Sequence, residues 1–178
     1  MEFGDQITFA GSNRLLDGFE FRYFINWEDV IDGDETARIR FYANDALSGS
    51  PGTLLYDSGT IDITPSLQAN SLALSDLSIS VPDTITWTVL FGGIGGDDSN
   101  ANGGGLMFFD PPTVGSSDST FFWAKETTGF TQVTVLGGTP NNFNARFTAN
   151  PVPEPATMLL LGTGLIGLAG FRRKLKKR

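Results

Sequence analysis

Residues 19–27 read FEFRYFINW, and this stretch decides the fold class. Its apolar side chains fall on every second position from Phe19 to Trp27, while the charged Glu20 and Arg22 lie between them. Successive side chains of a β-strand point to opposite faces, so this spacing places the apolar side chains on one face. The stretch therefore predicts a strand of an antiparallel sheet with a core on one side and solvent on the other.

The same alternation returns in short segments across residues 1–149. We expect further strands around residues 7–9, 38–42, 55–63, 84–91, 106–109, 121–124, 133–135 and 143–147. Turn sequences such as Ser50-Pro51-Gly52 separate them, and no segment before residue 156 has the 3.6-residue period of a helix. We therefore predict an all-β protein whose body is an antiparallel β-sandwich, jelly-roll-like in its number of strands, with a barrel as the alternative.

The composition excludes several classes of function. The chain has 178 residues, of which 40% are hydrophobic, and it contains no histidine and no cysteine. It therefore lacks the side chains of Ser-His-Asp and Cys-His catalysis and the usual ligands of zinc, haem and iron–sulfur clusters. Six of its 12 basic residues lie in 172–178, and 19 of its 20 acidic residues lie before residue 152, so the part up to residue 151 has a net charge of -13. Such an acidic body repels phosphate, and we expect no nucleic-acid partner.

The C-terminal end of the chain has a different character. Residues 156–171, ATMLLLGTGLIGLAGF, carry no charge and are followed by a basic cluster. A helix of this length spans about 24 Å, somewhat less than the hydrocarbon thickness of about 30 Å, and long basic side chains compensate by reaching the interface. We predict a single transmembrane helix at 156–171, in contact with membrane lipid, with a buried core helix as the alternative.

These features divide the chain into four parts. We expect a β-sandwich body at 1–149, a linker at 150–155, the transmembrane helix at 156–171 and a basic tail at 172–178. Basic flanks favour the cytoplasmic side of a membrane, so we expect a single-pass protein with its acidic body outside the cytoplasm.

The linker contains the motif Val152-Pro153-Glu154-Pro155, and the tail contains the basic residues Arg172, Arg173, Lys174, Lys176, Lys177 and Arg178. A Pro-Glu-Pro triplet, a short apolar helix and a basic cluster, in this order over residues 152–178, resemble the PEP-CTERM sorting signal. The resemblance implies recognition of the triplet by an exosortase, a membrane-embedded cysteine transpeptidase of bacteria that make exopolysaccharide. It also implies that 172–178 is a retention signal, and that processing near the triplet delivers the body to the bacterial surface or the medium. The two prolines keep this backbone extended, which suits presentation to a processing enzyme.

Two further observations concern export. Residues 38–60, RIRFYANDALSGSPGTLLYDSGT, resemble a stretch that recurs in the exported bodies of PEP-CTERM proteins, and this resemblance implies no activity. Residues 1–12, MEFGDQITFAGS, have neither the basic region nor the apolar region of a secretory signal peptide. We therefore expect the natural start of the protein to lie upstream of Met1.

The most polar loop, residues 92–105, contains Asp98, Asn100 and Asn102, which follow the first half of a calcium-loop pattern. Oxygen ligands on alternate residues suit Ca²⁺. The acidic ligand of the twelfth position is missing, since Phe109 stands there, and a long hairpin loop explains the same composition. We expect weak calcium binding at most and no other cofactor. The acidic residues 32–35 form a second loop with the same two interpretations.

Three functions of the body are compatible with these residues. The first is a non-enzymatic exported protein of the cell surface or extracellular matrix. The second is a carbohydrate-binding module of an exopolysaccharide matrix, with Trp27, Trp87 or Trp123 as its platform, although the spacing of Trp27 and Trp87 favours the core. The third is a carboxylate-dependent glycoside hydrolase, which needs two acids about 5 to 10 Å apart. We expect the first, with an exosortase, membrane lipid and exopolysaccharide as partners.

Overall fold

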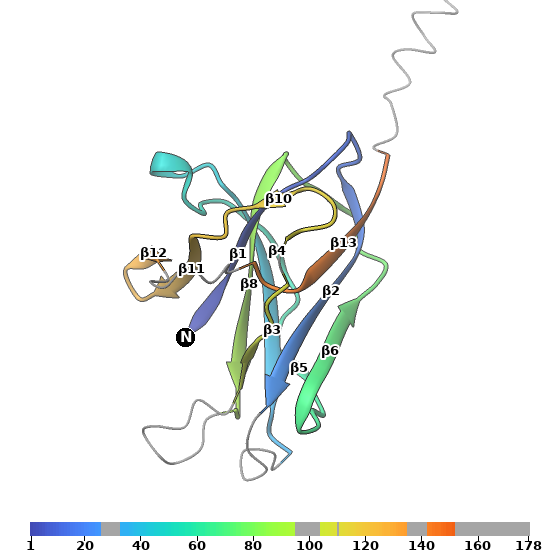
Figure 1. The fold of residues 1–178 in the computed structure, drawn as a ribbon, viewed down its shortest axis with the longest axis vertical. Coiled ribbons are helices and arrows are strands. Elements are labelled where there is room, and N and C mark those ends of the chain that lie inside the picture. The colour runs from blue at the N-terminus through green and yellow to red at the C-terminus, as the bar shows by residue number, and fades with distance from the viewer. Residues whose placement is uncertain (26–32, 95–103, 110, 135–141, 152–178) are drawn as a thin grey trace, which may run out of the picture.

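The computed structural model describes residues 1–25, 33–94, 104–109, 111–134 and 142–151, and its regular structure is almost entirely β-strand (Figure 1). The exception is a short 3-10 turn at Leu47–Gly49. The strands are β1 (Glu2–Thr8), β2 (Leu15–Ile25), β3 (Thr36–Ala43), β4 (Leu54–Asp57), β5 (Ile61–Asp62), β6 (Gln68–Leu74), β7 (Ile79–Ser80), β8 (Thr84–Gly92), β9 (Gly104–Leu106), β10 (Ser116–Ser117), β11 (Phe121–Glu126), β12 (Gly129–Thr134) and β13 (Ala145–Asn150). The prediction of an all-β protein is confirmed for these residues.

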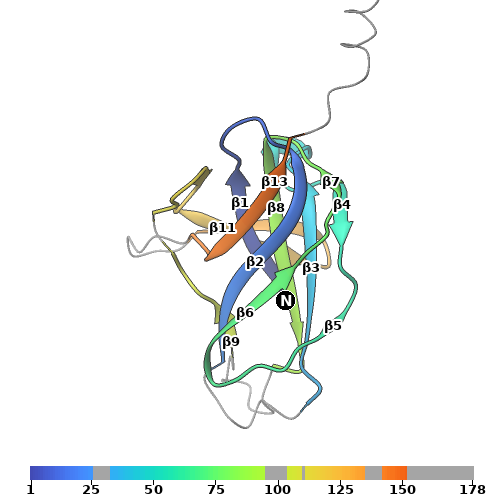
Figure 2. The ribbon, with the colours of Figure 1, turned by 90° about the vertical axis from the view of Figure 1, so that its right-hand side faces the viewer.

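The strands pair in two antiparallel sheets. In the eight-stranded sheet the order is β12-β11-β1-β8-β3-β4, with β10 beside β1 and β5 beside β3. In the five-stranded sheet the long strand β2 is central: β6 and β7 pair with one of its edges, and β13 and β9 pair with the other. Figure 2 shows β13, β2 and β6 crossing in front of β8 and β3. The two sheets therefore form two layers.

The core lies between these layers, as the alternating stretch of β2 predicts. The four alternate side chains from Phe19 to Ile25 are all buried. The centroid of the Phe19 ring lies 5.1 Å from that of Phe41 in β3 and 5.2 Å from that of Trp87 in β8. Because these contacts join one sheet to the other, the body is a sandwich with an aromatic core.

The outer face of the eight-stranded sheet differs from the expected solvated face. Thr86 and Thr88 of β8 alternate with the core residues, yet both are fully buried. The side chain of Asn44 is hydrogen-bonded to Thr86, and the side chain of Glu2 accepts a hydrogen bond from Thr88. Polar side chains of neighbouring segments therefore shield this face, which the alternation of β8 alone does not reveal.

Among the strands that depart from the sequence predictions are β6 and β12. The sequence does not predict β6, because QANSLAL combines polar and small residues. In the structure its side chains are at most partly buried. Its Leu72 and Leu74 nevertheless pack against the core. β12 begins at Gly129, earlier than the expected strand at 133–135, because it pairs along the whole length of β11. In both places, pairing with a neighbouring strand forms regular β-structure where the local sequence pattern is weak.

The linker beyond Pro151, the transmembrane helix predicted at 156–171 and the basic tail lie outside the described residues. Within the described ranges, no helix is long and apolar enough to cross a membrane. The last described strand, β13, ends at Asn150, the first residue of the predicted linker. The helix at 156–171 stays a prediction.

Candidate functional site

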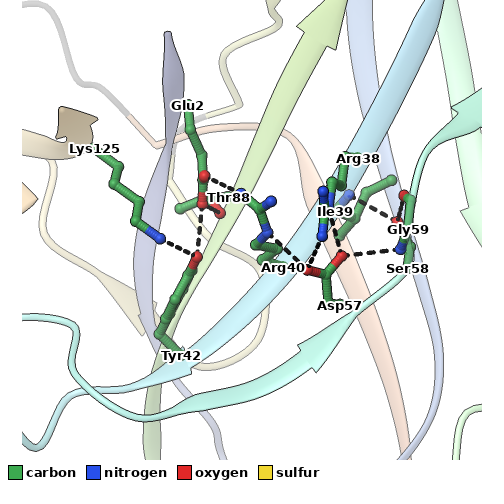
Figure 3. Close-up of polar contacts among 10 residues, drawn as sticks. All are labelled: Glu2, Arg38, Ile39, Arg40, Tyr42, Asp57, Ser58, Gly59, Thr88 and Lys125. Carbon is green, nitrogen blue, oxygen red and sulfur yellow. Dashed lines mark hydrogen bonds and ion pairs between the residues drawn. The ribbon is translucent and has the colours of Figure 1, made fainter. Parts of the chain in front are cut away.

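A network of charged and hydroxyl side chains covers the outer face of the eight-stranded sheet (Figure 3). At its centre, Glu2 Oε1 accepts hydrogen bonds from Tyr42 Oη at 2.9 Å and from Thr88 Oγ1 at 2.7 Å. Its other oxygen accepts a hydrogen bond from Arg40 Nη1. Lys125 Nζ donates to the Tyr42 hydroxyl at 2.8 Å. The network therefore links β1, β3, β8 and β11 across their strand directions.

Asp57 of β4 extends the network to the edge of the sheet. Its Oδ2 accepts hydrogen bonds from Arg40 Nε at 2.9 Å and Arg38 Nη2 at 2.6 Å, and its Oδ1 accepts from Arg38 Nε at 2.7 Å. These hydrogen bonds, first those of Arg38 and then those of Arg40, hold the pKa of Asp57 well below its usual range. The charged groups of this network satisfy one another, which is the arrangement of a brace between strands.

The inner face of β1 borders a cavity of about 570 Å³. Its walls are β1 with the residues that follow it, the segment 112–117 that includes β10, and residues 142–149, which lead into β13. Figure 1 shows β1, β10 and β13 together in the upper half of the molecule. The pairing of β10 with β1 holds one wall in place. The volume lies in the range of small-molecule sites, which is about 300–1,000 Å³.

Asp5 stands at the inner wall of this cavity, with 1% of its surface exposed. It lies opposite Trp87 in the register of β1 and β8, so its side chain points to the core. Its Oδ2 accepts hydrogen bonds from Ser117 Oγ at 2.8 Å and from the backbone N–H of Phe143 at 3.3 Å. Its Oδ1 is buried and has no hydrogen-bond partner among the described residues. Burial raises the pKa of Asp5 to about 7, against these hydrogen bonds, which lower it.

The rest of the cavity combines aromatic rings with neutral polar groups. The rings of Phe9 and Phe147 both line it and meet edge to face, with their centroids 5.4 Å apart. Phe109 and Val114 also line it, although they are 50% and 79% exposed. The described polar residues of the lining are Asp5, Thr8, Asn13, Thr113, Ser116, Ser117, Asn142, Asn144 and Arg146. The cavity is thus amphipathic, and the exposed lining residues that form its mouth include Phe109 and Val114.

The structure describes two of the three tryptophans proposed as a sugar platform, and both are buried. Trp87 is in the core, as its spacing predicts. Trp123 is 7% exposed, and its Nε1 donates a hydrogen bond to Gln6 Oε1 at 3.3 Å. Neither presents an exposed ring face, so the platform is wrong for these two residues. Trp27 lies outside the described residues.

The candidate calcium ligands Asp98, Asn100 and Asn102 lie outside the described residues. In the second acidic loop, Glu35 is buried and its carboxylate accepts a hydrogen bond from the backbone N–H of Gly33 at 3.2 Å. No group of three acidic side chains within the described ranges is arranged to hold a metal ion. The sorting residues 152–155 and the basic tail also lie beyond these ranges.

Sequence reasoning missed both the cavity and Asp5, although a signal for Asp5 exists. In the stretch FGDQITF, residues 3–9, apolar side chains stand at Phe3, Ile7 and Phe9, and Asp5 occupies the remaining position of the same face. An acid on the core face of a strand has a perturbed pKa, and such groups gather at functional sites. The cavity itself has no local signal, because the wall at residues 5–13 is about 100 residues from the segment 112–117 and still farther from residues 142–149 in the chain.

Comparison with known proteins gave one result, and it concerns the C-terminal end. No curated protein and no solved structure matched the chain. A family model described as the PEP-CTERM protein-sorting motif matched residues 151–174. The match includes the Pro-Glu-Pro triplet, the apolar segment and the first basic residues. The chain therefore carries a PEP-CTERM sorting motif at its C-terminus, which implies an exported protein that an exosortase processes.

Proposed function

We propose that the chain is a non-enzymatic protein of the bacterial cell surface or extracellular matrix. The sorting motif at 151–174 is the observation that carries this proposal. In the proposal, the segment 156–171 spans the membrane, the basic tail lies in the cytoplasm, and the body is a jelly-roll-like sandwich outside it. Processing at Pro153-Glu154-Pro155 then separates the body from its membrane segment.

The described residues of the body support a structural or binding role over hydrolysis. Both carboxylates of the outer-face network, Glu2 and Asp57, are paired with arginines, which does not favour a role for either as a free acid or base. In the cavity, Asp5 is the one carboxylate among the described lining residues. Glycoside hydrolysis by the usual mechanism needs two carboxylates that flank the bond.

A processing experiment tests the proposal. The chain is expressed behind a secretory leader in an exosortase-bearing bacterium, with an epitope inserted in the exposed turn at Leu47–Gly49. We expect the double variant Pro153→Ala, Pro155→Ala to stay uncleaved in the membrane fraction, while the parent chain reaches the surface or the medium. The matched control is Pro82→Ala, an exposed proline of the body. Normal processing of the double variant contradicts the assignment of the triplet.

A further inference from the structure

We propose that the cavity beside Asp5 is a binding site for a saccharide unit of one or two rings. This inference goes beyond export, because it concerns what the body binds after it has been delivered. It stands or falls independently of the sorting motif, since the described lining residues of the cavity all lie between residues 5 and 149.

The cavity offers the two kinds of surface that a sugar ring requires. A sugar ring has apolar C–H faces and a rim of hydroxyl groups, so its binding sites combine aromatic faces with groups that donate and accept hydrogen bonds. Phe9, Phe109 and Phe147 supply aromatic rings, and Asn13 and Asn144 supply amides. Thr113 and Ser117 supply hydroxyl groups, of which that of Ser117 already donates to Asp5. The Thr8 hydroxyl instead bonds to Thr84 on the outer face of the sheet. A hydrocarbon ligand would remove these polar groups from water without bonding to them.

The mouth of the cavity exposes apolar surface that a ligand would cover. Half of the Phe109 surface is exposed, although the sandwich has an aromatic core in which most rings are packed. The position of this residue is fixed, because its backbone N–H donates to the carbonyl of Asn142 at 2.8 Å. Val114, which also lines the cavity, is 79% exposed. Apolar groups held at the rim of a cavity mark a contact surface for a ligand.

The charges of the cavity disfavour an anionic ligand. The acid of its described lining, Asp5, faces the cavity, whereas the base, Arg146, alternates with Phe147 of the core and lies opposite Glu20 on the outer face of β13. An anionic ligand would therefore meet the carboxyl group of Asp5 without the guanidinium of Arg146 to offset it. Anions are further disfavoured by the net charge of -13 of the body. Neutral hydroxyl groups both donate and accept hydrogen bonds, so they suit amides, hydroxyls and a carboxyl group alike.

The walls are joined before any ligand arrives, which reduces the cost of binding. Through its Oδ2, Asp5 connects β1 both to Ser117 of β10 and to the backbone of Phe143. The backbone N–H of Asn144 donates to the carbonyl of Met107 at 2.7 Å. These bonds hold the three walls at a fixed separation.

The test measures sugar binding to the full chain in mild detergent. The probes are glucose, galactose, mannose, N-acetylglucosamine, cellobiose and chitobiose. Saturation-transfer NMR and titration calorimetry measure the binding of each. We expect at least one of them to bind with a Kd below about 10 mM. Phe109→Ala removes the ring at the mouth and should weaken this binding at least about fivefold. Val114→Trp, which puts a large ring at the mouth, should abolish it.

The control is Leu47→Ala, which removes a side chain of similar apolar character that is 92% exposed and not part of the cavity. This variant should keep the affinity of the parent chain, and all variants should share its Tm. The proposal is overturned if none of the six sugars binds at about 10 mM. It is also overturned if binding survives both Phe109→Ala and Val114→Trp, or if 1-octanol binds in the cavity and no sugar does.

Discussion

The Oδ2 atom of Asp5 lies 2.8 Å from the Oγ atom of Ser117, so a buried carboxyl bonds two strands that are 112 residues apart in the chain. The same oxygen accepts the backbone N–H of Phe143. One acid on the core face of β1 therefore fixes three walls of the cavity. Because burial raises its pKa, this arrangement makes the stability of the fold depend on pH.

The first prediction concerns Asp5→Asn. The pKa of Asp5 is about 7 in the folded protein and 3.8 without perturbation, so between these values the folded state binds more protons than the unfolded state. The free energy of unfolding contributed by Asp5 therefore falls as pH rises from about 4 to 7, by at most about 1.4 kcal/mol per pH unit, and is constant above. Asn does not titrate. The free energy of unfolding of the variant, relative to that of the parent chain, should therefore increase as pH rises through this window.

Denaturant unfolding at several pH values between about 4 and 8 measures this difference. Asp57→Asn is the control, and its parent–variant difference should stay nearly constant across this range. The pKa of Asp57 is lowered, so its contribution is present above its unfolded pKa and is lost as pH falls below it. A parent–variant difference for Asp5→Asn that stays flat from pH 4 to 7 contradicts the perturbed titration.

The second prediction concerns Glu2, the centre of the outer-face network. Glu2→Gln keeps an oxygen that accepts hydrogen bonds from Tyr42 and Thr88, but it removes the charge opposite Arg40, whose side chain is 14% exposed. Arg40 keeps Asp57 as a charged partner, but the amide at position 2 no longer balances the rest of its mostly buried guanidinium, so the free energy of unfolding should fall by about 1–3 kcal/mol.

The matched control for Glu2→Gln is Asp83→Asn. Asp83 also pairs with an arginine, Arg14, at 2.7 Å, but its side chain is 82% exposed. Exposed ion pairs contribute little, so this variant should unfold at nearly the same denaturant concentration as the parent. Equal losses for the two variants would show that burial of the Glu2–Arg40 pair does not increase its contribution to the free energy of unfolding.

The outer-face network also shows where sequence reasoning reaches its limit. Alternation predicts that Phe19, Phe21 and Trp87 face the core, because parity within one strand is a local property, and the structure confirms this. Parity also places Glu2 and Thr88 on the opposite face. Parity does not reveal that these two residues are in contact. Their contact requires β1 and β8 to be neighbours, and this pairing joins residues 86 positions apart in the chain.

The same limit explains why the cavity was missed. Its walls come from β1, β10 and β13, which meet only after both sheets have formed. The sorting motif is the opposite case. Its Pro-Glu-Pro triplet, apolar segment and basic residues are contiguous, so the sequence alone is sufficient to find it.

The third prediction concerns Gly4 in β1. A Cβ atom at this position would lie 1.9 Å from the carbonyl oxygen of Trp87 and 2.7 Å from the Cα of Thr88, and both atoms belong to the backbone of β8. Because neither atom can rotate away, Gly4→Ala must separate two paired strands. We expect a loss of about 3 kcal/mol or more in the free energy of unfolding.

Gly59→Ala is the comparison for Gly4→Ala. A Cβ at Gly59 meets no atom within 4 Å, but the residue has a φ of +67°. Its substitution carries only the cost of a left-handed backbone, about 1–2 kcal/mol. Chemical denaturation of both variants checks the order, and a smaller loss for Gly4→Ala than for Gly59→Ala is incompatible with the close approach of β1 and β8.

The fourth prediction concerns calcium and residues 98–102. If Asp98, Asn100 and Asn102 bind the ion, the missing acidic ligand of the twelfth position limits the affinity to about the millimolar range. A ligand at ten times its Kd stabilises the folded state by about 1.4 kcal/mol, so about 10 mM Ca²⁺ should raise Tm by no more than about 6 °C. Asp98→Asn should remove the rise, because it replaces the one charged ligand. Mg²⁺ at the same concentration controls for ionic strength, because it has the same charge as Ca²⁺. It should not occupy the calcium site, since it prefers a tighter octahedral shell. A Tm that Ca²⁺ leaves unchanged favours the hairpin-loop interpretation, in which Asn, Asp and Gly serve the turn and no cation is bound.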